Sequence, residues 1–501
     1  MTASLSDFKK ECARIARLVQ INALVDWDQQ TNMPPGGAEA RAEHSATLSE
    51  LIHGISTSDS YGELLANAEA ELQGADPDDD DARLLRVARR DYDRATKLPS
   101  RLVADLARHS AISQDRWVRA RAENDFAGFA PYLERMFELT REAAEHLGYE
   151  DHIYDALIDN YETGARQRQV SDMFADLKPK LVELTQAIAA SGRPVDSSIL
   201  RGRFPIEKQK VVTTRVVSAI GYEFSRGRQD EAAHPFCTNF SRDDVRITTR
   251  FDPGYIGIAL YASMHEAGHA LYEQGIPSEF DASPLGSGTS LGIHESQSRL
   301  WENLVGRSRP FARFLFPHLK DAFPDVLDGA QAEDFYRAVN SVSPSLIRID
   351  ADEVTYNLHV MLRFELECEL LTGALAISDL PEAWNARMEE YLGVRPPDDA
   401  HGVLQDVHWS AGIIGYFPTY SIGNLVSGQL WHAIRKAVPN LDDRIEIGSF
   451  ASILNWLRAN VHRHGRKFEP GELVQMATGE PLTSSYYVDY LTAKYSDIYE
   501  L

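Results

Sequence analysis

Helical periodicity dominates this chain of 501 residues. Apolar side chains recur every three to four positions, as at Phe8, Cys12, Ile15 and Val19, which is the spacing of one buried helix face. The same pattern covers residues 113–147, 170–190, 207–222, 255–274, 290–306, 352–373, 381–393, 422–437 and 443–463. The sequence therefore predicts a mainly α fold.

One segment departs from this pattern. From Asp244 to Phe251 apolar and polar side chains alternate, and several residues are β-branched, which is typical of a strand. Such a strand could offer its edge to an extended peptide, or it could belong to a small structural hairpin. Both alternatives stay open at this point.

Composition excludes some classes of function. The formal net charge is −24, which disfavours binding to nucleic acid or to an anionic membrane surface. No stretch approaches 18 apolar residues, so no membrane span is expected. The three cysteines, Cys12, Cys237 and Cys368, are far apart and have no metal-binding spacing. An odd number of scattered cysteines favours a reducing cytoplasm.

The sequence His265-Glu266-Ala267-Gly268-His269 matches H-E-x-x-H within a predicted helix. Residues four apart lie on one helix face, with Cβ atoms about 6 Å apart, so both imidazoles can bind one ion. Glu266 is displaced around the helix and could act as a base on a water molecule instead of binding the metal. This motif is typical of zinc-dependent peptidases.

A site with two histidines needs a third protein ligand. Glu273 lies eight residues from His265, a rise of roughly 12 Å, which is too far for a shared ion. Better candidates follow Thr289 or Ser290, either of which could cap a helix that presents His294 and Glu295 in its first turns. Periodicity does not decide between His294 and Glu295. The run from His462 to His464 is predicted to be a solvated helix end.

Several motifs together make the chain resemble the carboxypeptidase Taq family of metallocarboxypeptidases. The N-terminal segment from Asp26 to Pro35 also looks like that family. The motifs follow in order: His234-Pro235-Phe236, the D-x-R-x-T at Asp244, Arg246 and Thr248, the H-E-x-x-H, the H-E-S-Q from His294 to Gln297, the I-R-x-x-A-D at Ile347, Arg348, Ala351 and Asp352, and the G-x-x-Q-D-x-H-W from Gly402 to Trp409.

The resemblance implies a large helical gluzincin-type peptidase fold with a deep groove and a small β-sheet beside the zinc helix. It implies one domain over residues 1–501, with N-terminal helices forming one wall of the groove and a zinc-binding core at about 230–430. His265, His269 and Glu295 would hold one zinc ion, which cobalt could replace. The expected protein is a homodimer that removes single residues from peptides with a free C-terminus, with broad specificity.

Catalysis also needs donors for the oxyanion and a group that binds the substrate's terminal carboxylate. Related gluzincins use a late His and Tyr, for which the candidates here are His408 with Tyr420 or Tyr416. Arginine pairs well with carboxylates, and Arg348 and Arg246 are the candidates.

These residues also allow structural roles and other functions. Arg348 could instead pair internally with Asp350 or Asp352, and His408 could bond Asp406 or the backbone. The alternative functions are an oligoendopeptidase or dipeptidyl-type peptidase with the same metal core, and a catalytically inactive binding scaffold that zinc stabilises.

Overall fold

Helices account for most of the chain, as the periodicity predicts, and the strands form a single three-stranded sheet within residues 3–501. The computed structural model describes these residues, 3–501. The chain forms two compact units. Unit 1 holds the chain up to Thr96 and residues 197–339 and 427–481, and unit 2 holds residues 97–196, 340–426 and 482–501. One domain over residues 1–501 stays a prediction.

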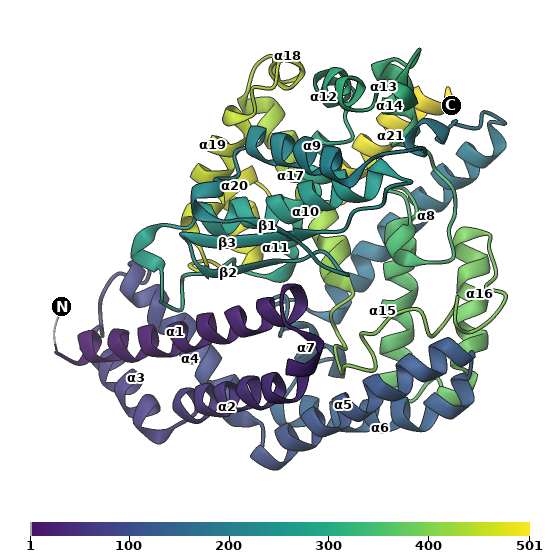
Figure 1. Ribbon diagram of the computed structural model, residues 1–501. Coiled ribbons are helices and arrows are strands. Elements are labelled where there is room, and N and C mark those ends of the chain that lie inside the picture. Colours follow the sequence, from purple (N-terminus) through teal and green to yellow (C-terminus); the bar gives the residue numbers. More distant parts are fainter. Residues whose placement is uncertain (1–2) are drawn as a thin grey trace. The chain divides into compact units, whose positions relative to one another are not determined.

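Unit 1 contains the sheet and most of the shorter helices (Figure 1). Two helices, α4 (Asp80–Lys97) and α17 (Pro418–Ala437), run across unit boundaries. The other helical elements of unit 1 are α1 (Ala3–Thr31), η1 (Pro35–Gly37), α2 (Ala38–Ser56), α3 (Asp59–Glu71), η2 (Ser198–Leu200), α9 (Ile206–Ala219), η3 (Phe224–Arg226), α10 (Ile256–Gly275), η4 (Ser278–Phe280), α11 (Leu291–Arg299), the π-helical η5 (Leu300–Val305), α12 (Arg309–Ala322), α13 (Pro324–Leu327), α14 (Ala332–Ala338), α18 (Leu441–Glu446), α19 (Ala451–Asn460), η8 (His462–His464) and α20 (Pro470–Thr478).

The sheet has the order β1 (Gln229–Glu231), β3 (Asp244–Thr249), β2 (Cys237–Ser241). The central strand β3 pairs in parallel with β1 and antiparallel with β2, and a bulge interrupts β2 between Asn239 and Ser241. The predicted strand is therefore confirmed, although it ends at Thr249 and not at Phe251. Val245 and Ile247 of β3 are fully buried, and α10 packs against β3 and β2.

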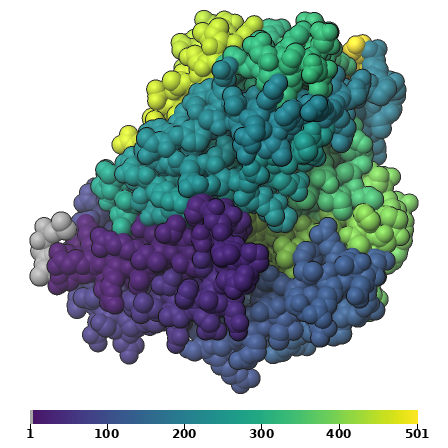
Figure 2. Space-filling view, viewed as in Figure 1, coloured from purple at the N-terminus to yellow at the C-terminus, as the bar shows by residue number. Residues whose placement is uncertain are grey.

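The N-terminal helices form an apolar cluster within unit 1, together with Ile276, Phe280 and Leu285. Phe8 of α1 and Leu65 of α3 are fully buried in it. Farther along α1, Trp27 packs edge-on against Phe240 of β2, with ring centroids 6.4 Å apart. Figure 2 shows the purple N-terminal segment lying against the teal part of unit 1. The helix that opens the chain therefore covers the β2 edge of the sheet.

Unit 2 has long helices and a fully buried central one. The middle of α15 (Tyr356–Thr372) is buried on all sides, and Leu358, Met361 and Leu362 have no exposed surface. Such a helix must be surrounded by other elements. The helical elements of unit 2, besides its part of α17, are α5 (Ser100–Glu123), α6 (Phe126–Leu147), α7 (Ile153–Ile158), α8 (Gln167–Ala190), η6 (Arg348–Asp350), α15 (Tyr356–Thr372), η7 (Ile377–Asp379), α16 (Leu380–Leu392) and α21 (Ser485–Tyr499).

Two predicted helices are wrong in extent. The helix predicted over 113–147 is two helices, because Asn124 takes a left-handed conformation (φ 55°) that ends α5, and Asp125 then caps α6 through the Gly128 N–H. The helix predicted over 443–463 is also interrupted, at Gly448 with φ 75°. Apolar spacing carries on across both breaks, so the spacing alone does not reveal where a helix is interrupted.

None of the helices within residues 3–501 combines the length and the apolar character needed to cross a membrane.

Candidate metal centre

Two histidines of α10 stand on the same face of the helix. His265 and His269 are four residues apart, and their ring centroids are 4.9 Å apart. Glu266 lies between them in sequence and is buried, with 6% of its surface exposed. The helical prediction for H-E-x-x-H is thus confirmed, and the two imidazoles are close enough to bind one ion.

The next helix, α11, packs very closely against α10. A Cβ atom added at Gly268 would lie 2.6 Å from the Ser298 Cα and 2.7 Å from the Gln297 carbonyl oxygen, so only glycine fits there. The α11 helix begins after Ser290, whose hydroxyl accepts the Ile293 N–H at 3.1 Å, as predicted for one of the two capping candidates. This close approach carries the first turns of α11 to the histidine face.

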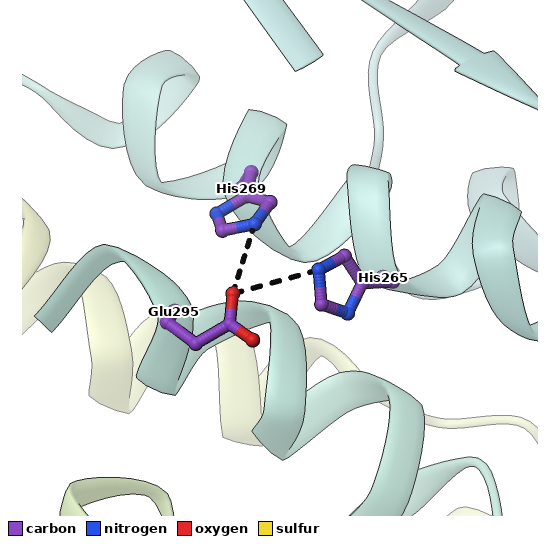
Figure 3. A group of neighbouring side chains, drawn as sticks. All are labelled: His265, His269 and Glu295. Carbon is purple, nitrogen blue, oxygen red and sulfur yellow. Dashed lines mark ion pairs between the residues drawn. The ribbon is translucent and has the colours of Figure 1, made fainter. Parts of the chain in front are cut away.

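Glu295 of α11 points its carboxylate at both imidazoles (Figure 3). Its Oε2 lies 3.5 Å from His265 Nε2 and 3.4 Å from His269 Nε2. In a tetrahedral zinc site with bonds of about 2.0–2.1 Å, neighbouring ligand atoms are roughly 3.3–3.5 Å apart. One ligand atom from each of the three residues lies within 4.8 Å of the others. The donor set of two His and one Glu therefore fits a divalent metal such as zinc.

The outer nitrogen of His265 is held by a carboxylate. His265 Nδ1 donates to Glu302 Oε2 at 2.9 Å, and Glu302 also accepts from Arg299 at 3.4 Å and Arg307 at 3.3 Å. A histidine whose Nδ1 carries the proton presents an unprotonated Nε2, which is the form that binds a metal. Glu302 therefore fixes both the tautomer and the direction of the His265 ring.

The Glu295 carboxylate is kept ionised although it is buried. Burial alone would raise its pKa, but Arg299 and the two histidines hold the pKa well below its ordinary value. Arg299 Nε donates to Oε1 at 2.7 Å, and the Ser298 hydroxyl donates to Oε2 at 3.1 Å. A charged carboxylate in a fixed orientation is what a divalent cation requires.

Glu266 has the electrostatic surroundings of a base that works near neutral pH. Burial raises its pKa to about 7, helped by the negative charges of Glu295 and Glu302, while His265 acts in the opposite direction. A pKa near the working pH favours transfer of a proton in both directions.

The other third-ligand candidate, His294, lies behind His269 and not in the ligand set. Its Nδ1 is 2.6 Å from His269 Nδ1, and its Nε2 is 2.7 Å from Glu273 Oε1. Glu273 is likewise outside the ligand set, as its distance along the helix predicts. The packing of α11 thus places Glu295 between the Nε2 atoms of the two histidines and places its neighbour His294 at the Nδ1 side of His269.

Arg348 and Asp406 form a buried ion pair in unit 2. Arg348 is 5% exposed, and its Nε and Nη2 donate to Asp406 Oδ1 at 3.2 and 2.8 Å. Arg363 of α15 donates to Oδ2 at 2.6 Å, and the two arginines hold the Asp406 pKa far below normal against the effect of burial. The alternative pairing of Arg348 with Asp350 or Asp352 is therefore wrong. Asp352 instead accepts backbone N–H groups, including that of Val354.

His408 lies in the same part of unit 2. Its Nε2 is 3.4 Å from the Tyr420 hydroxyl, and its Nδ1 is 3.9 Å from Asp406 Oδ1, which is too long for a hydrogen bond. Its ring packs on Phe417 and is 5.5 Å from the Tyr416 ring between centroids. Burial lowers the His408 pKa to about 4, although Asp406 acts in the opposite direction. His408 is therefore neutral at pH 7.

Arg246, on β3 in unit 1, is also paired. Its Nε and Nη2 each donate to one oxygen of Asp244 at 2.9 Å. Its guanidinium stacks 4.3 Å from the Trp27 ring centroid and 4.8 Å from that of Phe240. Both candidate arginines therefore already contact a carboxylate of the protein.

The residues that hold the candidate ligands in place were not predicted from the sequence. Glu302 follows Glu295 by seven residues, which returns it to the same side of a helix, so its position carried a usable signal. Asn239 lies on a strand, and its side chain donates to Glu273 Oε2 at 2.6 Å. Nothing in the sequence indicated this contact.

Comparison with known proteins agrees with this geometry over nearly the whole chain. Residues 7–495 match the family model described as carboxypeptidase Taq (M32) metallopeptidase. Thermostable carboxypeptidase 1 of Thermus thermophilus is 43% identical over 99% of this chain and 98% of its own length, and carboxypeptidase 1 of Bacillus subtilis is 38% identical over 97% of each. The crystal structure of the M32 carboxypeptidase from Deinococcus radiodurans R1 covers 100% of both chains with a TM-score of 0.97 and 44% identity. With a helical fold, an H-E-x-x-H helix and a clustered His-His-Glu set, this chain belongs to the carboxypeptidase Taq (M32) family of metallopeptidases.

Proposed function

We propose that this metallocarboxypeptidase holds one zinc ion with His265, His269 and Glu295 and releases single C-terminal amino acids from peptides with broad specificity. The observation that carries the proposal is the convergence of two imidazole nitrogens and one ionised carboxylate. Zinc favours this mixture of nitrogen and oxygen donors, and cobalt should be able to replace it.

Glu266 is the proposed general base. Zinc, when bound, lowers the pKa of water and polarises a carbonyl group. Glu266 takes a proton from the attacking water at its carboxylate and passes it to the nitrogen of the departing amino acid. Its pKa of about 7 allows both transfers near neutral pH.

His408 and Tyr420 are the proposed donors to the oxyanion, with Tyr416 as the second candidate for the tyrosine. A neutral imidazole and a phenol can each donate one hydrogen bond. The lowered pKa of His408, to about 4, keeps it neutral at the pH where Glu266 is active. This part of the proposal depends on the chemistry of these side chains and on the family motif that includes His408.

Arg348 is the proposed site for the substrate's terminal carboxylate, and Arg246 is the second candidate. Asp406 and the Tyr356 hydroxyl accept hydrogen bonds from three of the N–H groups of Arg348. A guanidinium has five N–H groups, and these contacts use three of them. The ion pair with Asp406 also holds the planar group in one orientation, which lowers the entropy lost on binding.

Replacing Arg348 by Ala should lower kcat/KM on free-acid peptides about 30-fold or more. The lost charge-assisted hydrogen bonds are worth roughly 2–5 kcal/mol, and each 1.4 kcal/mol is about tenfold. Amidated peptides lack the charge and should change much less. Steady-state kinetics on matched pairs of peptides measure the difference, and zinc content should stay unchanged.

Two further variants control this test. Arg348→Lys keeps a charge but loses the planar fork, and should fall between wild type and Ala. Arg395→Ala removes an exposed arginine of unit 2 that pairs with Glu382 and should behave as wild type. Equal losses on both kinds of peptide, together with a lower Tm, would assign Arg348 a structural role with Asp406, and Arg246 would be tested next.

The proposed activity is tested by mass spectrometry. The protein with added zinc or cobalt is incubated with short peptides whose C-termini are free or amidated. We expect products shorter by one C-terminal residue, from free-acid peptides alone, and none after chelation. Internal cleavage of amidated peptides would indicate an oligoendopeptidase, release of dipeptides a dipeptidyl-type peptidase, and metal binding without cleavage an inactive scaffold.

We also propose a homodimer in the cytoplasm. The homodimer follows from the family resemblance. The reducing compartment is supported by three cysteines without disulfide partners, of which Cys12 and Cys368 are buried.

A further inference from the structure

A chain of short polar contacts leads away from His269 through unit 1. His269 Nδ1 is 2.6 Å from His294 Nδ1, and His294 Nε2 is 2.7 Å from Glu273 Oε1. Glu273 Oε2 then accepts the side-chain N–H of Asn239 at 2.6 Å. The four residues come from α10, α11, α10 again and β2. The chain therefore ties the candidate ligand to the second helix of the site and to the sheet.

The directions of these hydrogen bonds follow from the chemistry of the groups. If His269 binds a metal through Nε2, its neutral ring carries the proton on Nδ1 and donates it to His294. His294 must then be unprotonated at Nδ1 and protonated at Nε2, so it donates to Glu273. Each donor thus points toward the Glu273 carboxylate, which the Asn239 amide also stabilises. One arrangement of protons satisfies all three contacts.

The His294 ring is also held sterically. It lies 5.2 Å from the ring of Tyr272 and 4.7 Å from that of His269, measured between centroids. A Cβ atom added at Gly288 would lie 2.7 Å from His294 Cδ2, so the preceding loop also lies against the ring. A ring enclosed in this way keeps a fixed direction for its two nitrogens.

The two candidate histidine ligands are supported differently. The outer nitrogen of His265, Nδ1, donates directly to Glu302, whereas the outer nitrogen of His269 is connected to a carboxylate through a second imidazole. Groups behind a ligand fix its tautomer and orientation, and their loss typically costs 10–100-fold in metal affinity. His294 and Glu273 stand where such groups are needed, although neither belongs to the ligand set.

We propose that His294 and Glu273 are positioning residues that fix the tautomer and ring direction of His269, with Asn239 orienting Glu273. This rests on the proposed metal site, since His269 must be a ligand for its direction to matter. The contacts that connect His269, His294, Glu273 and Asn239, here called the relay, connect the H-E-x-x-H helix to the sheet. We expect loss of the relay to weaken metal retention, and to affect catalysis through that weakening.

Three substitutions of His294 separate its two contacts. Asn has an oxygen where Nδ1 stood, so His294→Asn keeps an acceptor for His269 but cannot reach Glu273. Gln has its terminal group nearer the position of Nε2, so His294→Gln keeps the contact with Glu273 and loses the one with His269. His294→Leu removes both. Glu273→Gln keeps an acceptor for His294 and removes the charge.

The measurement is the rate at which each zinc-loaded or cobalt-loaded protein releases metal to excess chelator. We expect His294→Leu and His294→Gln to release metal about 10–100-fold faster than wild type. His294→Asn and Glu273→Gln should lie between them and wild type. The visible spectrum of the cobalt protein should change in the same order, because it reports the geometry of the ligands and not the stability of the fold.

Tyr272→Phe is the matched control. The Tyr272 ring contacts His294, and its hydroxyl accepts the Thr289 N–H at 3.3 Å. The variant therefore disturbs the surroundings of His294 without removing any of the three contacts that connect His269, His294, Glu273 and Asn239. It should release metal at the wild-type rate. Circular dichroism before and after chelation checks that each variant is folded.

The outcomes separate this proposal from the proposed function. Wild-type release rates and an unchanged cobalt spectrum in His294→Leu, or in Glu273→Gln and His294→Asn if the Leu variant does not fold, would overturn the relay. Equally fast release from Tyr272→Phe would also overturn it, since the effect would then be general loosening of the pocket. A wild-type protein that binds no metal would instead overturn the proposed metal site.

Discussion

Replacing Glu266 by Gln is expected to abolish turnover while the metal stays bound. Gln has nearly the same shape but cannot accept a proton from water, and loss of a general base typically costs about 10²–10⁴-fold in rate. Glu266 is buried and follows His265 in the sequence, but it does not belong to the group of His265, His269 and Glu295 that could hold a metal. Its replacement should therefore leave the metal in place. The variant should therefore keep full metal content and lose kcat.

The measurement combines kcat on a free-acid peptide with the metal content per chain after dialysis. Glu279→Gln removes an exposed carboxylate from the same unit and should leave both quantities unchanged. If Glu266→Gln kept its activity within a few fold of wild type, Glu266 would not be the base. Loss of metal along with activity would make Glu266 a contributor to the metal site.

The second large effect is expected from Glu295→Ala, which should strip the metal and with it the activity. Glu295 supplies the oxygen that lies 3.4–3.5 Å from both imidazole nitrogens, and no other carboxylate in residues 3–501 joins this ligand set. The substitution also removes the carboxylate that accepts from Arg299 Nε at 2.7 Å, so less negative charge would offset the Arg299 guanidinium near the site. Both effects weaken binding of a cation.

Metal content after dialysis distinguishes Glu295 from the neighbouring candidate. His294→Ala should keep most of its metal under these conditions, because a residue behind a ligand weakens binding less than loss of the ligand does. Glu295→Gln keeps a hydrogen-bonding group near Arg299 and shows how much of the loss comes from charge. The reverse ranking, with His294→Ala empty and Glu295→Ala loaded, would mean that the third ligand is His294.

The elements of the site that depend on local pattern were predictable. The periodicity of residues 255–274 predicts the helix observed from Ile256 to Gly275, and the four-residue spacing predicts that His265 and His269 share a face. Ser290 is one of the two capping residues that the sequence offered, and α11 begins directly after it. Such features depend on neighbours within one or two turns, so the sequence expresses them directly.

Contacts between distant residues were not predictable in this way. Asp406 is 58 residues from Arg348, and the two nearer aspartates were plausible partners until the fold placed Asp406 against the guanidinium. The predicted solvated helix end from His462 to His464 is wrong at His462 for the same reason, although Arg463 is exposed. His462 is 1% exposed and its Nε2 contacts Gln297 Oε1 at 2.9 Å, because α11 covers it.

The sequence by itself determined the helical fold, the face that carries the two histidines, and the short list of third ligands. Only the tertiary structure decided which of these candidates lies beside the two histidines. His294 and Glu295 are adjacent on one helix and point about 100° apart, so the packing partner of α11 determines which of them faces α10. That packing depends on Gly268, where the absence of a side chain lets the two helices approach until Glu295 meets both imidazoles. Periodicity indicates that a helix face is buried. It does not indicate which element packs against that face, and the set of side chains that meet at the site depends on that element.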